Sequence, residues 1–417
     1  MTLFASTAGR NARPKPREGP NRREDDMAGK TVRKTIQEIN ERIKKGKAVV
    51  LTAGEMTELV KSSGAKAAAK EVDVVATGTF STMCSSGILF NIGQEPPVMK
   101  VSRLLMNGVP AYSGLAAVDA YMGCTEPRED DPLNKVYPGR FLYGGGHVIE
   151  DLVRGKKIRL EAEAYGTDCY PRKELTKDIT LADLPQCWLL NPRNCYQNYN
   201  AAVNMGHKTI YTYMGPLKPG ARNVNFATAG EYSPLFNDPL FKTIGLGTRI
   251  LLGGGIGYCI GHGTQHVARP QRTELGLPLT PSGTLMLKGD LKQMSAEYLR
   301  GMSVVGYGCS LAVGVGIPIP VLDEDIARHT GVSDADIKMP IKDYGYDYPN
   351  GKPDILGHAT FEELLSGEVR IKKRSQPIAT VPVTSRPKCI EVAEDLKKRI
   401  QSGKFLLTEK VEEIPAG

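Results

Sequence analysis

Among the eight cysteines of the chain, Cys84 stands in surroundings that suit thiol chemistry. It lies within residues 77–87, where glycines and small hydroxyl side chains surround a single thiol just beyond a predicted strand. A helix that begins near Ser81 would direct its unpaired N–H groups and positive dipole end toward a thiolate and stabilise it. The alternative is a small buried core residue, the commonest fate of a free cysteine. The polar setting favours Cys84 as a catalytic nucleophile.

Cys169 is the second candidate, because it also follows a predicted strand and lies in a polar turn, residues 166–172. Arg172 and the lysine after it supply positive charge that favours a thiolate, whereas Asp168 opposes it or orients a proton. A surface thiol with charged neighbours is the alternative. We interpret Cys84 and Cys169 as the two catalytic thiols.

The other six cysteines give weaker signals. Cys187 and Cys195 lie too far apart for the CxxC pairs of zinc and iron–sulfur sites, so we expect no metal there. Cys124, in a polar turn, is a candidate lining residue of the site. For the remaining three we expect packing roles: Cys259, Cys309 and Cys389.

Residues 253–261 form a glycine-rich run that raises the alternative of a nicotinamide cofactor. The spacing is GxGxxxG rather than the GxGxxG of the Rossmann fingerprint, and Pro270 and Pro278 interrupt the helix expected after it. A loop close to a small substrate or to another chain segment is the favoured interpretation. His262 and His266 lack the intervening glutamate of a zinc protease, so we expect no metal ligands here and leave hydrogen bonding or proton transfer open for His262.

The composition narrows the class of protein. The net charge of +8 comes from 54 basic and 46 acidic residues mixed along the chain, without the basic stripe of a nucleic-acid-binding protein. Eight cysteines in 417 residues are too few for a disulfide scaffold, and no secretory signal is visible, which favours a cytoplasmic protein. No uninterrupted apolar run reaches the length of about 20 residues that spans a bilayer, so we expect no membrane association.

The elements that position these thiols form an α/β pattern. A capping box opens a predicted helix over 35–43, a strand follows at 48–51, a helix at 55–61, and a second strand at 72–76 leads to Cys84. Further on, a helix is predicted over 148–153 and a strand over 158–164. Two glycine-dense apolar stretches read as buried strands with tight turns, 244–263 and 304–322.

These elements predict a layered mixed sheet with glycine-rich turns. Residues 1–26 are rich in proline and charge and are interpreted as a disordered leader, with Met27 as a candidate start. Residues 27–366 are assigned to a catalytic α/β region of one or two subdomains. Residues 367–417 are assigned to a C-terminal α+β appendage with a helix at 390–400.

Four motifs in order resemble the homocysteine biosynthesis family of anaerobic archaea and bacteria, whose activity is that of an L-aspartate semialdehyde sulfurtransferase. The resemblance spans about residues 31–400. The motifs are TFSTMCSSG at 79–87, GLAAVDAY at 114–121, GGGHVIEDL at 144–152 and AYGTDCYP at 164–171.

The resemblance implies that sulfur and two electrons convert the aldehyde of L-aspartate semialdehyde into the thiol of homocysteine. It places the functional thiols on Cys84 and Cys169. One thiolate accepts sulfur as a persulfide, and the second releases it by forming a disulfide. Low-ranking candidates for substrate binding are His147 or Tyr165, which would polarise the aldehyde, and Arg172, which would hold the carboxylate.

The resemblance also implies partners. No ferredoxin-like cysteine run is present, so electrons should come from a separate ferredoxin-like iron–sulfur protein, with sulfide or a persulfide as the sulfur source. We expect no tightly bound cofactor and no metal, and a homo-oligomer is compatible with the sequence. Two alternatives stay open: a nicotinamide-dependent oxidoreductase that uses residues 253–261, and a non-catalytic small-ligand binding protein.

Overall fold

The computed structural model describes residues 32–346, 348–371 and 374–416. From Val32 onward the chain makes one compact unit, so the predicted boundary at residue 367 falls inside it. The predicted leader, residues 1–26, lies outside the described residues. Within the described part of the chain, no helix has both the length and the apolar character needed to cross a membrane.

The N-terminal elements follow the predicted alternation of helix and strand. The capping box of Thr35 with Glu38 opens the first helix, and a second box of Thr52 with Glu55 opens the next. A short third helix, which was not predicted, precedes the second strand. The elements are α1 Ile36–Lys44, β1 Val50–Thr52, α2 Ala53–Ser63, α3 Ala65–Glu71 and β2 Val74–Ala76. A later strand, β21 Pro318–Pro320, joins them in a sheet of order β1-β2-β21.

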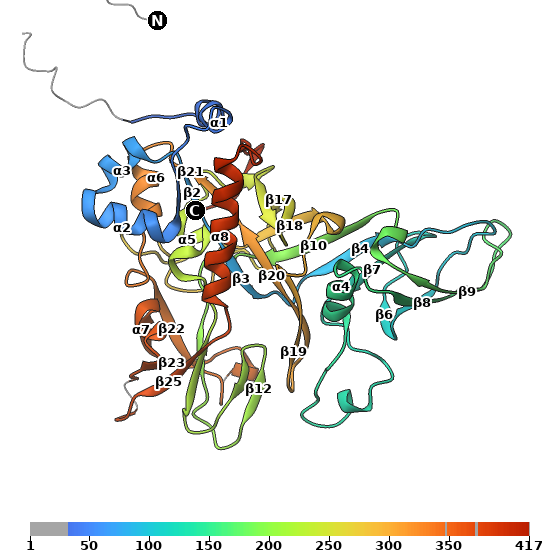
Figure 1. Cartoon of the computed structure of the whole chain (residues 1–417). Coiled ribbons are helices and arrows are strands. Elements are labelled where there is room, and N and C mark those ends of the chain that lie inside the picture. The colour runs from blue at the N-terminus through green and yellow to red at the C-terminus, as the bar shows by residue number, and fades with distance from the viewer. Residues whose placement is uncertain (1–31, 347, 372–373, 417) are drawn as a thin grey trace, which may run out of the picture. The chain divides into compact units, whose positions relative to one another are not determined.

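A large sheet of nine strands forms the centre of the fold, in the order β19-β20-β16-β17-β18-β10-β4-β7, with β3 paired to β20 (Figure 1). Every pair of neighbours in it is antiparallel. Both glycine-dense stretches contribute to it, as predicted. The strands are β3 Thr79–Thr82, β4 Gly87–Asn91, β7 Asp119–Gly123, β10 Cys187–Asn194, β16 Arg249–Leu252, β17 Gly255–His262, β18 Leu285–Asp290, β19 Leu299–Val304 and β20 Gly308–Gly316.

Smaller sheets extend from this centre. One has the order β6-β5-β8-β9 and another the order β23-β22-β11-β14-β25-β24. Their strands are β5 Arg103–Met106, β6 Val109–Ala111, β8 Ile158–Glu163, β9 Glu174–Ile179, β11 Ala201–Val203, β14 Asn223–Phe226, β22 Lys338–Asp343, β23 Ile355–Thr360, β24 Glu368–Val369 and β25 Ile378–Pro382. Two further pairs are β12 Ile210–Thr212 with β13 Gly215–Leu217, and β15 Gly245–Leu246 with β26 Glu412–Glu413.

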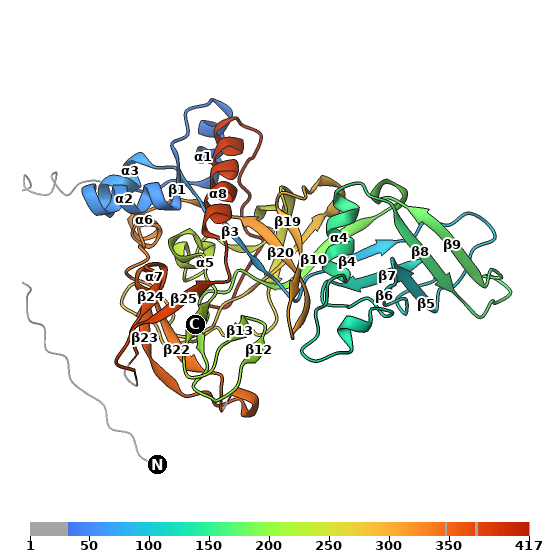
Figure 2. The same ribbon diagram turned by 60° about the horizontal axis from the view of Figure 1, so that its bottom comes forward.

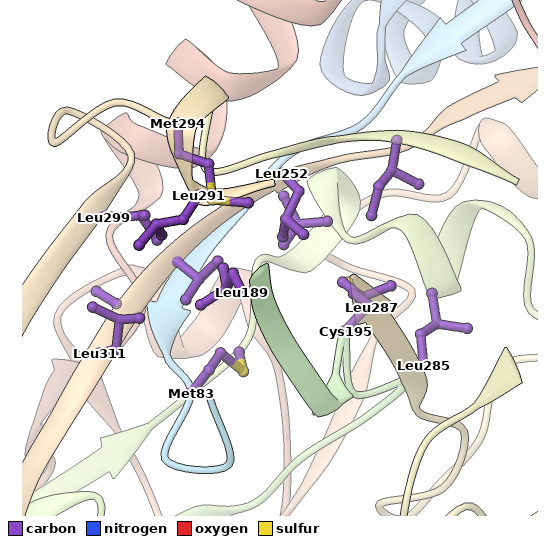
Figure 3. Packing of buried hydrophobic residues seen from close by; sticks show 14 of the residues in the cluster. Met83, Leu189, Cys195, Leu252, Leu285, Leu287, Leu291, Met294, Leu299 and Leu311 are labelled. Carbon is purple, nitrogen blue, oxygen red and sulfur yellow. The ribbon is translucent and has the colours of Figure 1, made fainter. Parts of the chain in front are cut away.

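The main core lies where the central sheet meets its helices. Figure 3 shows part of it, with Met83, Leu189 and Leu252 among the buried side chains. The remaining helices are α4 Gly145–Val153, α5 Pro234–Asn237, α6 Glu324–Thr330, α7 Phe361–Leu365 and α8 Arg386–Gln401. Helix α8 lies against β1, β3 and β20 and buries Val392 and Leu396 there. The fold is therefore α/β, as predicted, and its C-terminal helix belongs to the core.

Strand β20 is buried along its whole length, because α4 packs on its first half and α8 on its second. The glycines at 144–146 permit α4 to pack closely on the central sheet. A Cβ on Gly146 would collide with the carbonyl oxygen of Ser310 in β20, and a Cβ on Gly145 would collide with the carbonyl oxygen of Gly123 in β7. These glycines therefore serve close packing of helix on sheet.

Replacing Gly146 with alanine is expected to lower the free energy of unfolding by about 1–3 kcal/mol, because the added methyl group overpacks the contact with β20. Urea denaturation measures the change. Gly123→Ala is the matched control: its Cβ meets nothing within 4 Å, so stability should stay within about 0.5 kcal/mol. Equal stability of both variants would contradict the assignment of tight packing.

Candidate functional site

Cys84 lies in the tight turn that joins β3 to β4. The N–H of Met83 donates to the Leu311 carbonyl oxygen at 2.7 Å, and the N–H of Ser86 donates back to the Met83 carbonyl oxygen at 3.0 Å. No helix begins near Ser81, so no helix dipole acts on Cys84: residues 79–82 pair with β20 as an antiparallel strand. The Cys84 side chain is half-buried, and its Sγ lies 3.2 Å from the Ser310 Oγ of β20.

Cys124 supports this turn from behind. Its N–H donates to the Ser86 carbonyl oxygen at 2.9 Å, and its Sγ lies 3.5 Å from the carbonyl oxygens of both Met83 and Cys84. Burial raises the pKa of the Cys124 thiol, so it stays protonated and donates its S–H. Cys124 therefore positions the turn and does not line the cavity in front of it.

The Cys84 side chain opens into a cavity of about 260 Å³. Its walls come from five parts of the chain: β3 and the Cys84 turn, the end of β10 with the segment after it, residues 213–214, residues 227–229 and residues 383–384. Single residues from two further loops complete it, Gln265 and Tyr307. The site thus forms between the central sheet and segments that border the six-stranded sheet.

Hydroxyl groups and one cation make this cavity polar. Arg193 is the one charged side chain among the described residues that line it, beside tyrosines 196, 199, 213 and 307. The hydroxyl oxygens of Tyr213 and Tyr344 are 2.6 Å apart. Burial raises the pKa of Tyr213, so its phenol stays protonated and acts as a hydrogen-bond donor or acceptor.

Cys195 also lines the cavity, a position that was not predicted from its sequence surroundings. It has a left-handed backbone conformation, with φ of 51°, and its N–H donates to the Asn194 Oδ1 at 2.6 Å. Burial raises the pKa of its thiol, which keeps Cys195 protonated. The cavity lining therefore includes two thiols in different settings: a half-buried thiol in a tight turn and a buried one in the wall.

The structure does not bring Cys169 to this cavity. Cys169 is exposed in the turn between β8 and β9, where its Sγ lies 3.8 Å from the Thr167 Oγ1. Tyr165, which is 70% exposed, and Arg172 share this turn, and none of the three lines the cavity. Figure 1 and Figure 2 both show β8 and β9 at the right-hand edge of the view, with β4 and β7 between them and β3.

His147 lies in the first turn of α4, outside the cavity. Its Nε2 is 3.3 Å from the Ser303 Oγ, and its ring stacks on Tyr143 with centroids 5.6 Å apart. Burial lowers the pKa of this imidazole, so it is neutral at physiological pH. Its Nδ1 is buried and has no hydrogen-bond partner among the described residues. These contacts place His147 between α4 and β19.

The glycine run at 253–261 does not form a dinucleotide site. Gly253 and Gly254 make the tight turn of the antiparallel β16–β17 hairpin, whereas the Rossmann fingerprint requires a parallel βαβ unit. His262 and His266 lie near each other, with ring centroids 5.4 Å apart. No group of three or more His, Cys, Asp or Glu side chains suited to a metal occurs within the described ranges.

Sequence reasoning missed most of the cavity wall. Residues 193–199 combine an arginine, a cysteine and two tyrosines at and just beyond the end of a long strand, and this density of polar aromatic residues was the available signal. Arg193 and Tyr196 interact, with the guanidinium carbon 5.9 Å from the ring centroid. The remaining wall residues come from distant segments, which only the fold brings together.

Comparison with known proteins gives a consistent result. Residues 48–407 match the family described as "Homocysteine biosynthesis enzyme, sulfur-incorporation". A Methanocaldococcus jannaschii protein named L-aspartate semialdehyde sulfurtransferase is 50% identical over 394 residues, which cover 92% of this chain and 74% of the relative. A Methanosarcina acetivorans protein of the same name is 46% identical over 383 residues, covering 92% and 72%. No solved structure matches the chain.

Proposed function

Because the chain belongs to the family of sulfur-incorporating homocysteine biosynthesis enzymes, we propose that it converts L-aspartate semialdehyde into L-homocysteine in the Cys84 cavity. The relatives that carry the name of this sulfurtransferase share about half of their aligned residues with the chain. The observation that supports the proposal is the placement of Cys84: a half-buried thiol in a tight turn that faces a partly open cavity lined by hydroxyl groups and one arginine.

The cavity suits the reaction in three ways. Ser310 lies within hydrogen-bond distance of the Cys84 sulfur and stabilises a thiolate when its hydroxyl donates. The tyrosine hydroxyls offer donors to a carbonyl oxygen that becomes negatively charged during attack. The cavity walls shield one side of the reacting centre from water, which reduces side reactions of the sulfur intermediates.

The proposed relay starts from a disulfide between Cys84 and Cys169. Hydrosulfide attacks it, which leaves a persulfide on Cys84 and a free thiol on Cys169. The terminal persulfide sulfur adds to the aldehyde carbon, and the carbonyl oxygen takes up a proton. The Cys169 thiolate then attacks the Cys84 sulfur, which re-forms the disulfide and releases the substrate as its hemithioacetal.

Loss of water converts this hemithioacetal into a thioaldehyde, which two electrons and two protons reduce to the thiol of homocysteine. The proposed source of the electrons is a separate ferredoxin-like iron–sulfur protein. A persulfide donor would instead transfer its outer sulfur directly to the Cys84 thiolate. The disulfide formed when the product is released would then have to be reduced by two further electrons. In both cases the protein supplies two thiols and the partner supplies the reducing power.

The relay requires the β8–β9 turn to come to a cavity that it does not line in the structure. A second copy of the chain that inserts its turn, or a movement of the four-stranded sheet, would meet this requirement. Tyr165 and Arg172 would arrive with Cys169, since all three lie in the same turn. Their proposed roles in polarising the aldehyde and holding the carboxylate therefore depend on the same approach, and His147 has no such route from α4.

The direct test is a coupled assay with L-aspartate semialdehyde, ³⁴S-labelled sulfide and a reduced iron–sulfur protein. We expect L-homocysteine that contains the heavy sulfur and that depends on both the chain and the reductant. Mass spectrometry identifies the product. Failure to form homocysteine under reducing, anaerobic conditions, with protein that is folded by circular dichroism, would refute the proposed function.

A further inference from the structure

Arg193 occupies a defined position beside the Cys84 turn. It lies near the end of β10, and its carbonyl oxygen accepts a hydrogen bond from the Ser85 Oγ at 3.0 Å. Its N–H donates to the Asn191 Oδ1 at 3.4 Å. Ser85 directly follows Cys84, so this hydrogen bond holds the two backbone segments together. The side chains of Arg193 and Cys84 consequently line one cavity.

The charge of Arg193 has no acidic counterpart in this cavity. No aspartate or glutamate occurs among the described residues that line it. Arg193 forms no ion pair with any other described residue, and the contact found for its guanidinium is the face of the Tyr196 ring. An arginine presents a planar fork of donors that matches a carboxylate. A half-buried guanidinium without an anion beside it therefore forms an incomplete site that a carboxylate ligand completes.

We infer that Arg193 binds the α-carboxylate of the substrate while Cys84 faces its aldehyde; this inference rests on the proposed function. Three carbon–carbon bonds, or about 4 Å, separate the carboxylate carbon from the aldehyde carbon of a four-carbon semialdehyde. A substrate held at both ends thus needs a thiol and a guanidinium on neighbouring parts of one wall. Arg193 meets this requirement within a single chain, whereas Arg172 does not line the cavity.

The tyrosines of the cavity complement this assignment. The α-ammonium group of the substrate needs a partner, and no carboxylate is present in the wall. Aromatic faces and phenol oxygens bind ammonium groups, and tyrosines 196, 199 and 213 provide them. The cavity therefore selects α-amino acids over dicarboxylates, because a second carboxylate would lie against tyrosine rings without a cation.

The first test separates binding of the carboxylate from the chemistry. Steady-state rates are measured with L-aspartate semialdehyde and with 3-aminopropanal, which is the same aldehyde without its carboxylate. We expect Arg193→Gln to raise the KM for the natural substrate roughly 10- to 100-fold, with a smaller effect on kcat, and to leave kcat/KM for 3-aminopropanal within about threefold. The KM of Arg193→Lys for L-aspartate semialdehyde should lie between those of the wild type and Arg193→Gln, because lysine keeps the positive charge but lacks the planar fork of N–H donors of arginine. Arg140→Gln, an exposed arginine outside the cavity, is the matched control.

A second test needs no turnover. Alkylation of Cys84 by iodoacetamide is followed on the peptide that contains it, with and without L-2-aminobutyrate or propylamine. We expect L-2-aminobutyrate to slow alkylation in the wild type and not in Arg193→Gln, whereas propylamine protects neither. Protection that persists in Arg193→Gln, or equal loss of activity toward both aldehydes, would overturn the inference even if homocysteine is formed. Carboxylate-dependent protection without any homocysteine would instead refute only the proposed function.

Discussion

Replacing Cys84 with serine is expected to lower the rate of homocysteine formation at least about 10³-fold, because a hydroxyl oxygen cannot carry the transferred sulfur. The change conserves the size of a half-buried side chain in a turn whose backbone is held by Leu311 and Cys124, so the fold should be unaffected. The coupled assay measures the rate, and thermal unfolding checks that the variant is folded.

Cys195→Ala is the matched control for this prediction. Its thiol lines the same cavity but stays protonated, because burial raises its pKa. We expect this variant to keep activity within about tenfold of the wild type, a loss attributable to altered packing. If Cys195→Ala were inactive and Cys84→Ser active, the nucleophile would be the buried thiol of the wall and our assignment would be reversed.

Replacing Cys169 with alanine is expected to lower turnover about 10²-fold or more, because no second thiol then releases sulfur from Cys84. The change should leave stability unaltered, since Cys169 is exposed in a turn. With sulfide as the sole sulfur source, Cys84 should remain an unmodified thiol. With polysulfide, it should accumulate a persulfide, which mass spectrometry detects as one additional sulfur atom on the Cys84 peptide.

Mixing the two inactive variants shows how the turn reaches the cavity. If Cys84→Ser supplies its Cys169 to the intact Cys84 of the Cys169→Ala variant, activity returns in the mixture and the relay operates between two copies. If activity stays absent in a mixture that has been allowed to exchange subunits, the turn serves the cavity of its own chain. Full activity of Cys169→Ala alone would exclude the two-thiol relay.

Local patterns in the sequence predicted most of the elements. The capping box at Thr35, the alternation of helix and strand before Cys84 and the glycine-dense strands all follow from periodicity and caps. The helix start considered near Ser81 is not formed, for a physical reason. Residues 79–82 have the polar hydroxyls of a turn or helix start, yet pairing with β20 buries them within the sheet.

The site itself could be predicted only in part. Cys84 was identifiable because its neighbours are small and polar. Arg193, Tyr196 and Tyr199 join it through pairing between β4 and β10, and the other tyrosines come from separate segments. Cys84 and Cys169 each follow a strand, but those strands belong to two different sheets. Sequence spacing does not determine which strands share a sheet, so it could not show that the two thiols lie apart.

The hydrogen bond between Thr384 Oγ1 and Ser81 Oγ, 3.0 Å long, joins the first wall segment of the cavity to the last. About three hundred residues separate these two hydroxyls in the chain. During synthesis on the ribosome, the turn with Cys84 emerges long before residue 384 does. The cavity therefore closes only after residue 384 has emerged, and until then the nascent chain exposes the Cys84 thiol to any oxidant in the cell.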